Sequence, residues 1–186
     1  LRYSYAGTMG AVNSPAGDYF FRRIGATNQD RGICSPAKQA AFKSVYGDTI
    51  AIKPQEAQYS DLIILWSINA IATDLHFLHD VNVAKQRGAT VWVIDTHKTY
   101  TYDQATHHVY VKPGSDGALA LGLMHIIHRD DLADIDFIQR YVQGYEELVI
   151  DVLATFTPEY VSSICGVPAK VIEELAHTYA KAKAPF

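Results

Sequence analysis

The stretch that decides the fold is residues 61–95, DLIILWSINAIATDLHFLHDVNVAKQRGATVWVID. It opens with a short continuous apolar run over residues 61–66, which predicts a strand buried on both faces. In the segment that follows, apolar residues recur every three positions, at Leu75, Leu78, Val81 and Ala84. That spacing favours a helix with one apolar side, and Gly88 is typical of a helix end. Residues 90–94 form a second β-rich run ending at Asp95, so the stretch predicts a right-handed βαβ unit with parallel strands.

The residues after this unit continue the alternation of strand and helix. A third short strand is predicted at residues 108–111, and Pro113-Gly114 is typical of a turn. Ser115 or Asp116 then caps a helix. The predicted core positions of that helix are Leu119, Leu123, Ile126 and Ile127.

The last third of the chain is predicted to be helical. A helix over residues 135–143 would carry Ile135, Ile138 and Val142 on one side. Two further helices are predicted after Thr157-Pro158 and after Pro168, where a proline suits a first helical turn. The apolar side of the last helix would consist of Val171, Ile172, Leu175 and Tyr179.

The first 55 residues are less regular. A strand end is predicted at residues 1–5, and short helices at 16–24 and 35–45. We therefore predict an α/β protein whose main part is a parallel-sheet, Rossmann-like dinucleotide-binding domain with a helical C-terminal part. Residues 1–55 would form a loop-rich N-terminal part, and residues 56–186 the compact dinucleotide-binding domain.

Composition excludes several classes of protein. The 186 residues carry 16 Lys and Arg against 20 Asp and Glu, a net charge of −4, which lacks the basic footprint of a nucleic-acid binder. No window approaches 18 consecutive apolar residues, so no membrane span is predicted. The chain begins with neither a methionine nor a signal peptide, which suggests a piece of a longer protein and a cytoplasmic location, with the periplasm as the alternative.

The candidate binding residues follow the three predicted strands. In open α/β sheets, ligands bind outside the carboxyl ends of the strands. The polar or turn residues at these ends are Ser67, Asn69, Asp95, Thr96, Lys98, Gly114 and Asp116. Each alone also suits a helix cap or a turn, but three polar strand ends together favour a dinucleotide site. The sequence has no GxGxxG, which disfavours an NAD-type site.

Two cysteines are too few for a disulfide framework or for the four thiolates of an iron–sulfur cluster. Cys34 precedes a predicted helix, where a thiolate is favoured and suits metal ligation or nucleophilic chemistry. The alternative is a buried, inert thiol, which is what we predict for Cys165 in its apolar surroundings. The eight histidines show no zinc spacing, and HExxH, GxSxG and P-loop motifs are absent from the sequence.

Several of these motifs, in this order, resemble the molybdopterin oxidoreductases of the dimethyl-sulfoxide-reductase and formate-dehydrogenase type. The resemblance rests on residues 60–127 and on the segments DRGICSPA, YVQGYEEL and FTPEYVSSICGVPAKVIEELAHTYA. The family pattern is a strand ending in Trp-Gly-x-Asn, then Ala-Lys-x-x-Gly-Ala, a strand ending in Asp-Pro-Arg-Arg/Lys-Thr, and Pro-Gly-Thr/Ser-Asp. This chain departs from it at Ser67, where the family has Gly, and at Thr96-His97, which replaces Pro-Arg.

The resemblance implies oxidation or reduction of a small substrate at molybdenum or tungsten held by two molybdopterin guanine dinucleotides. It implies that Ser67 and Asn69 approach the pyrophosphate or the pterin. It implies that the guanosine end is held by Asp95, Thr96, Lys98, Gly114 and Asp116. Cys34 falls near the position where the family has its Cys, selenocysteine or Ser ligand to the metal, with Ile33 as the alternative at that position, which makes Cys34 the implied catalytic residue. The loop Gly7–Gly10 resembles a small-residue loop near the cofactor.

The same resemblance implies that this chain is a fragment of a catalytic subunit. A 4Fe-4S cluster would be bound by a segment that precedes Leu1, and a second dinucleotide-binding half would follow Phe186. The expected partners are these remaining domains of the same polypeptide and an electron-transfer subunit, and the isolated fragment would be inactive. Two alternatives stay open: the middle domain of a thiamine-diphosphate enzyme, which has a similar topology, and a non-catalytic binding domain on the same fold.

Overall fold

The computed structural model describes residues 1, 3, 10, 12–30, 32–48 and 51–186. The chain forms two compact units, Leu1–Ala51 and Ile52–Phe186. In the first unit, helices α1 (Asn13–Arg23) and α2 (Ser35–Tyr46) match the two short helices predicted from the sequence. None of the described side chains of α2 is buried within the structure. The predicted strand end at residues 1–5 and the loop Gly7–Gly10 involve residues outside the described ones.

The second unit is built on a parallel sheet with the strand order β1-β2-β3. Strand β1 (Leu62–Trp66) pairs with β2 (Thr90–Asp95), which pairs with β3 (His107–Tyr110). Between β1 and β2 lie α3 (Ala70–Thr73) and α4 (Leu75–Gln86), which confirms the predicted crossover. Short 3-10 turns, η1 (Pro54–Tyr59) and η2 (Tyr100–Gln104), precede β1 and follow β2.

The helical C-terminal part is also present. Its elements are α5 (Asp116–Arg129), α6 (Ile135–Tyr141), α7 (Tyr145–Asp151), η3 (Leu153–Thr155), α8 (Pro158–Cys165) and α9 (Ala169–Lys181). The chain then returns to the sheet, where Pro185 bridges Leu62 in parallel. The Asp61 carboxylate holds this return by accepting hydrogen bonds from the backbone N–H groups of Lys183 and Ala184.

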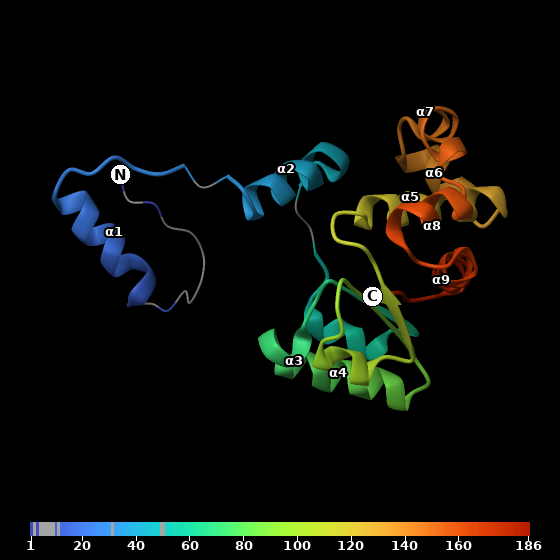
Figure 1. The fold of residues 1–186 in the computed structure, drawn as a ribbon, viewed down its shortest axis with the longest axis horizontal. Helices are drawn as coiled ribbons and strands as arrows, with labels where there is room; N and C mark the ends of the chain where they lie inside the picture. The colour runs from blue at the N-terminus through green and yellow to red at the C-terminus, as the bar shows by residue number, and fades with distance from the viewer. Residues whose placement is uncertain (2, 4–9, 11, 31, 49–50) are drawn as a thin grey trace. The chain divides into compact units, whose positions relative to one another are not determined.

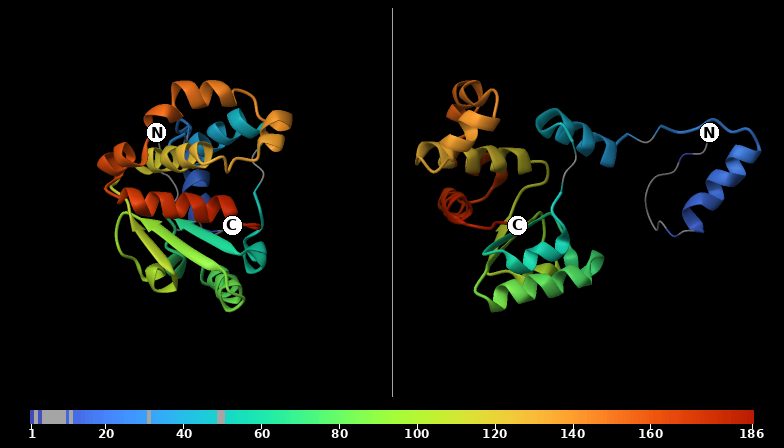
Figure 2. Two further views of the ribbon diagram at one scale, coloured as in Figure 1. Left: turned by 90° about the vertical axis from the view of Figure 1, so that its right-hand side faces the viewer. Right: turned by 180° about the vertical axis from the view of Figure 1, so that it is seen from behind.

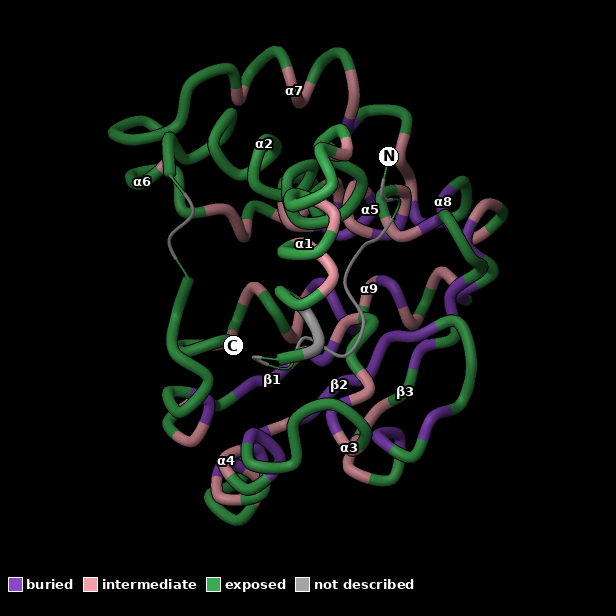
Figure 3. The backbone as a smooth tube through the Cα atoms, turned by 90° about the vertical axis from the view of Figure 1, so that its left-hand side faces the viewer, coloured by how far each residue is buried: buried purple, intermediate pink, exposed green. Residues whose placement is uncertain are grey.

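Two hydrophobic layers cover the two faces of the sheet (Figures 1 and 2). Alternate strand residues point to opposite faces. Leu62 and Trp92 therefore pack with α5, α8 and α9, whereas Ile63 and Val91 pack with α4. Figure 3 shows that burial is concentrated in the strands and in the sides of the helices that face them. Strands β1 and β2 are thus buried on both faces, as expected for a parallel sheet covered by helices, whereas β3 exposes His108 and Tyr110.

Four residues that the sequence places on apolar sides of helices are exposed in the structure. Leu75 is the first residue of α4 and is 66% exposed, because the apolar side of the helix reaches the sheet only from Phe77 onward. The apolar side predicted for residues 135–143 is largely uncovered, with Ile135 and Val142 both exposed. Tyr179 is 45% exposed near the end of α9. Helical spacing identifies an apolar side but not whether another element covers it.

No single helix in the described part of the chain is long and apolar enough to cross a membrane. One strongly bent pair, Tyr145–Thr155 with Pro158–Cys165, passes the same test of length and composition.

Candidate functional site

The loop after β1 begins with a strained residue. Ser67 has a φ of +55°, a left-handed conformation that glycine adopts without steric cost. Its backbone N–H donates a 2.8 Å hydrogen bond to the Ile94 carbonyl, so the loop stays attached to the end of β2. The family pattern has glycine at this position, and the observed φ supplies the physical reason.

Asn69 and Lys98 line one pocket. The pocket has a volume of about 500 Å³ and lies between the loop after β1 and the loop after β2. Its lining residues are Asn69, His97, Lys98, Thr99, Tyr100 and Asp103. The structure therefore brings together two of the predicted binding residues from different strand ends. The pocket lies at the carboxyl edge of the sheet, where α/β proteins bind ligands.

Asp95 ends β2 in a nearly buried position, with 8% of its surface exposed. Its carboxylate accepts a 2.7 Å hydrogen bond from the Thr96 backbone N–H and lies 3.8 Å from the His97 Nδ1. Tyr102 links this strand end to β3, because its hydroxyl lies within hydrogen-bond distance of the Asp95 carbonyl at 3.4 Å and of the Val109 carbonyl at 3.1 Å. Burial, with Tyr110 and Asp95 nearby, raises the pKa of Tyr102 to about 12, so Tyr102 acts as a neutral donor.

Gly114 and Asp116 shape the third strand end. Gly114 adopts a φ of +79° in the turn before α5, and a Cβ built there would meet open space. Ser115 occupies the N-cap position, and Asp116 is the first residue of the helix. The Asp116 Oδ1 accepts a 2.8 Å hydrogen bond from the Trp66 indole N–H. Asp116 is thereby tied to the end of β1 and lies on the same edge of the sheet as Ser67.

Two threonines near Asn69 were missed by the sequence analysis. Thr101 is fully buried, and its hydroxyl donates a 2.9 Å hydrogen bond to the Asn69 Oδ1. Thr99 is 8% exposed, and its hydroxyl has no hydrogen-bond partner in the structure. A threonine in a loop carries no sequence signal for burial. Only the short separation of Thr99 and Thr101 from Asp95 in the sequence could have suggested that they belong to the site.

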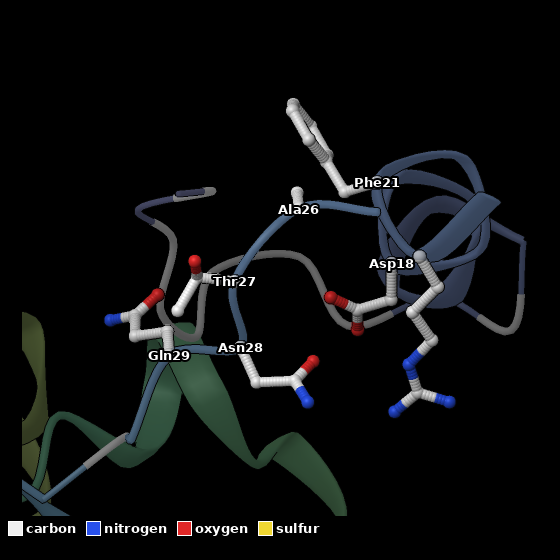
Figure 4. Close-up of a pocket in the computed structure, with 7 residues that line it drawn as sticks. Asp18, Phe21, Ala26, Thr27, Asn28 and Gln29 are labelled. Carbon is white, nitrogen blue, oxygen red and sulfur yellow. The ribbon is translucent and has the colours of Figure 1, made fainter. Parts of the chain in front are cut away.

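The first unit carries Cys34 at the N-cap position of α2, with an exposed side chain. The alternative of a buried, inert thiol at Cys34 is therefore wrong, whereas Cys165 is buried as predicted. Among the described residues, no three His, Cys, Asp or Glu side chains cluster as a metal site would require. A separate pocket of about 300 Å³ lies beside α1, and the side chains of Asp18, Thr27 and Asn28 project around it (Figure 4).

Comparison with known proteins places the chain in a family. A family model described as "Molybdopterin oxidoreductase" matches residues 3–141, well over half of the chain. The chain belongs to the molybdopterin oxidoreductase family. The resemblance inferred from the sequence motifs is thereby confirmed, and the thiamine-diphosphate alternative is wrong.

Two relatives of this molybdopterin oxidoreductase chain show how much of such a protein it spans. The probable oxidoreductase YoaE of Bacillus subtilis (strain 168) is 39% identical over 187 aligned residues, which cover 100% of this chain and 27% of the relative. Formate dehydrogenase H of Escherichia coli (strain K12) is 31% identical over 163 residues, which cover 86% of this chain and 23% of the relative. The chain thus spans about a quarter of the length of these relatives.

A solved structure shows the same fold. Acetylene hydratase from Pelobacter acetylenicus superimposes with a TM-score of 0.73 at 20% sequence identity. The likeness covers 89% of this molybdopterin oxidoreductase chain and 23% of the hydratase chain. At this level of identity the comparison concerns the fold alone.

Proposed function

We propose that the carboxyl edge of the sheet binds the nucleotide portion of a molybdopterin guanine dinucleotide. Residues 56–186 would then be the dinucleotide-binding domain of an oxidoreductase that acts on a small substrate. The observation that carries this proposal is the pocket shared by Asn69 and Lys98, with a buried, unpartnered Thr99 hydroxyl in its wall. Buried hydroxyls are normally hydrogen-bonded, so a ligand oxygen at this point would complete the site.

The chemistry of the donors fits a nucleotide diphosphate. Lys98 brings a cation and Asn69 an amide to the pocket, and both suit phosphate oxygens. Asp95 is an acceptor at the end of the middle strand, where a carboxylate suits the hydroxyls of a ribose or the N–H groups of a guanine. Thr96, Gly114 and Asp116 would complete the guanosine side, with the Asp116 carboxylate held in place by Trp66.

Molybdenum or tungsten bound by the pterin dithiolene would supply the redox chemistry of the complete protein. This chain would bind and orient the nucleotide end of the cofactor. We also propose that Cys34 ligates the metal through its thiolate, because thiolates are soft ligands and its side chain is exposed at the start of α2. Further domains of a longer polypeptide would supply the second dinucleotide site and a 4Fe-4S cluster, and an electron-transfer subunit would be the redox partner.

The test uses the complete polypeptide that carries this chain, produced in cells supplied with molybdate or tungstate. Metal content and the GMP released by acid hydrolysis are measured for each purified polypeptide. We expect stoichiometric GMP in the native protein and a clear loss in Asp95→Ala and Lys98→Ala. Lys181→Ala, an exposed lysine at the end of α9, serves as the control and should keep its GMP. Native protein that releases no guanine nucleotide would show that this edge does not bind the cofactor.

The proposed role of Cys34 has its own test in the same protein. Cys34→Ser should keep the nucleotide content, because Cys34 belongs to the first unit, but should lower metal-dependent turnover. Cys165→Ser is the matched control, since Cys165 is buried in the hydrophobic core and should affect stability rather than turnover. Unchanged turnover in Cys34→Ser would remove Cys34 from the metal site.

A further inference from the structure

Thr101 is fully buried and is bonded to Asn69, a residue that lines the pocket. Its hydroxyl donates a 2.9 Å hydrogen bond to the Asn69 Oδ1 and accepts a 3.4 Å hydrogen bond from the Ile71 backbone N–H. Thr101 is part of η2, whereas Asn69 directly precedes α3. One side chain thus joins the loop after β2 to the loop after β1. Thr101 itself is not among the residues that line the pocket.

This arrangement fixes the direction of the Asn69 amide. A hydroxyl group has a single hydrogen, and in Thr101 that hydrogen is given to Asn69. The atom of Asn69 that faces Thr101 must therefore be the oxygen. If the amide were turned over, its N–H₂ group would face Thr101, and the hydrogen bond from Thr101 to Asn69 would be lost. Because the Oδ1 is bonded to Thr101, the amide N–H₂ group is the part of the Asn69 side chain that remains to donate to a ligand.

A second observation concerns Thr99, whose hydroxyl lacks the acceptor that a ligand could supply. Thr99 lines the same pocket, is more than nine-tenths buried, and has a hydroxyl without a partner. Lys98 adds an ammonium group to the same wall. Residues that line the pocket therefore carry an amide N–H₂, a hydroxyl and an ammonium group, which can all donate hydrogen bonds. Asp103, the one carboxylate in the lining, is exposed, so water screens its charge.

We propose that Thr101 is a positioning residue, which orients the Asn69 amide so that it donates to the diphosphate oxygens of the nucleotide, and that Thr99 donates to the same group. This inference rests on the proposed function. It extends that function by assigning the pocket to the diphosphate. It adds Thr99 as a residue that contacts the ligand and Thr101 as a residue that acts only through Asn69.

The experiment measures guanosine diphosphate binding to the full chain by calorimetry, with guanosine as the comparison ligand that lacks phosphate. Thr101→Val removes the hydroxyl with little change in volume, and we expect it to weaken guanosine diphosphate binding about five- to tenfold, the effect of one lost hydrogen bond. Guanosine binding should not change. Thr101→Ser keeps a hydroxyl and should bind within about twofold of the native chain. Thr101→Ala is a second variant without the hydroxyl.

A double-mutant cycle shows whether Thr101 acts through Asn69. Asn69→Ala should weaken guanosine diphosphate binding about as much as Thr101→Val, and the double variant should bind no more weakly than Asn69→Ala alone. Thr99→Val should add a further loss to either variant. Thr106→Val is the matched control, because its hydroxyl makes two 2.8 Å bonds to the Val91 backbone, at the start of β2. It should lower the melting temperature without changing binding.

Three results would overturn the inference, and they differ from a failure of the proposed function. Additive losses in the double variant would show that Thr101 does not act through Asn69. Native binding in Thr101→Val, together with weak binding in Asn69→Ala, would remove Thr101 and leave the nucleotide site intact. Equal losses for guanosine and guanosine diphosphate would exclude the diphosphate assignment. If the native chain bound neither ligand and the complete polypeptide released no GMP, the proposed function would fail, and this inference with it.

Discussion

The Trp66 indole N–H donates a 2.8 Å hydrogen bond to the Asp116 carboxylate, which joins the end of β1 to the first turn of α5. The two residues are 50 positions apart in the sequence. This bond crosses the carboxyl edge of the sheet and fixes where α5 begins relative to β1. It also uses one of the acceptor sites of the Asp116 carboxylate, and the remaining sites stay open to a ligand.

Removing this acceptor should destabilise the second unit. We expect Asp116→Ala to lower the free energy of unfolding by about 1–2 kcal/mol, because a half-buried indole N–H loses a charged partner. Asp116→Asn keeps an oxygen acceptor and should cost less than about 1 kcal/mol. Urea denaturation, followed by tryptophan fluorescence, measures both. Equal losses in the two variants would show that the charge at the start of α5 matters rather than the bond to Trp66.

The backbone strain at Ser67 predicts an unusual order of stabilities. Ser67→Gly should leave the protein at least as stable as the native chain, because glycine adopts a φ of +55° without steric cost. Ser67→Val should destabilise it by about 1–2 kcal/mol, since β-branched residues are disfavoured in that conformation. Thermal unfolding of the two variants tests the order. A valine variant as stable as the glycine variant would contradict the left-handed conformation.

Gly122 allows α8 to pack closely against α5. A Cβ at residue 122 would lie 2.9 Å from a methyl carbon of the buried Val161. Gly122→Ala should therefore destabilise the protein by about 1–3 kcal/mol through overpacking. Gly117→Ala is the control in the same helix, because a Cβ there meets nothing within 4 Å, and it should stabilise the protein by up to about 1 kcal/mol. Both are measured by urea denaturation.

If the loss in Gly122→Ala comes from Val161, shortening Val161 should reduce it. The double variant Gly122→Ala with Val161→Ala should be more stable than the sum of the two single changes predicts. If the two losses of stability are simply additive, the loss in Gly122→Ala does not come from contact with Val161 but from a shift of α8 as a whole against α5.

The ion network at the end of α5 predicts how stability depends on pH. Hydrogen bonds from Arg129 and from His177 hold the pKa of the Asp130 carboxyl well below its ordinary value of 3.8. The unfolded chain therefore takes up this proton at a higher pH than the folded chain does. The contribution of Asp130 to stability is complete above pH 3.8 and is lost as the pH falls below it.

Asp130→Asn should thus have a lower melting temperature than the native protein near neutral pH and a smaller further loss in acid. Asp131→Asn, at the exposed neighbouring residue, should follow the native pH dependence. Melting temperatures between neutral pH and the acid limit of folding test this prediction. Parallel curves for the native protein and Asp130→Asn would show that the network contributes nothing. Because the network is largely exposed, we expect a modest effect that salt weakens.

Local patterns were sufficient for the elements of the sheet. The apolar runs predicted at residues 61–66 and 90–94 correspond to β1 (Leu62–Trp66) and β2 (Thr90–Asp95), since a strand buried on both faces needs apolar residues at nearly every position. Helix α8 follows Thr157 as predicted, and the Thr157 side chain caps it by accepting a hydrogen bond from the Tyr160 backbone N–H. Such preferences depend on neighbours along the chain and are therefore visible in the sequence.

The same local patterns failed where a second element decides the outcome. Leu75 has the spacing of a core residue but lies before the part of α4 that reaches the sheet. Asp116 was predicted as a cap or a base ligand, and its bond to Trp66 could not be foreseen, because it depends on how α5 is placed over β1. Thr99 and Thr101 have the composition of an ordinary loop, and one of them proves to be fully buried.

The sequence by itself predicts the parallel strands and the helices between them. It also predicts the family and the edge of the sheet where the polar residues gather. All of these depend on the order and spacing of residue types. Only the tertiary structure decided that Thr101 faces Asn69, that Thr99 is buried without a partner, and that Trp66 holds Asp116. The physical reason is that a hydrogen bond between distant residues depends on the packing of whole elements, which no single segment of the chain specifies.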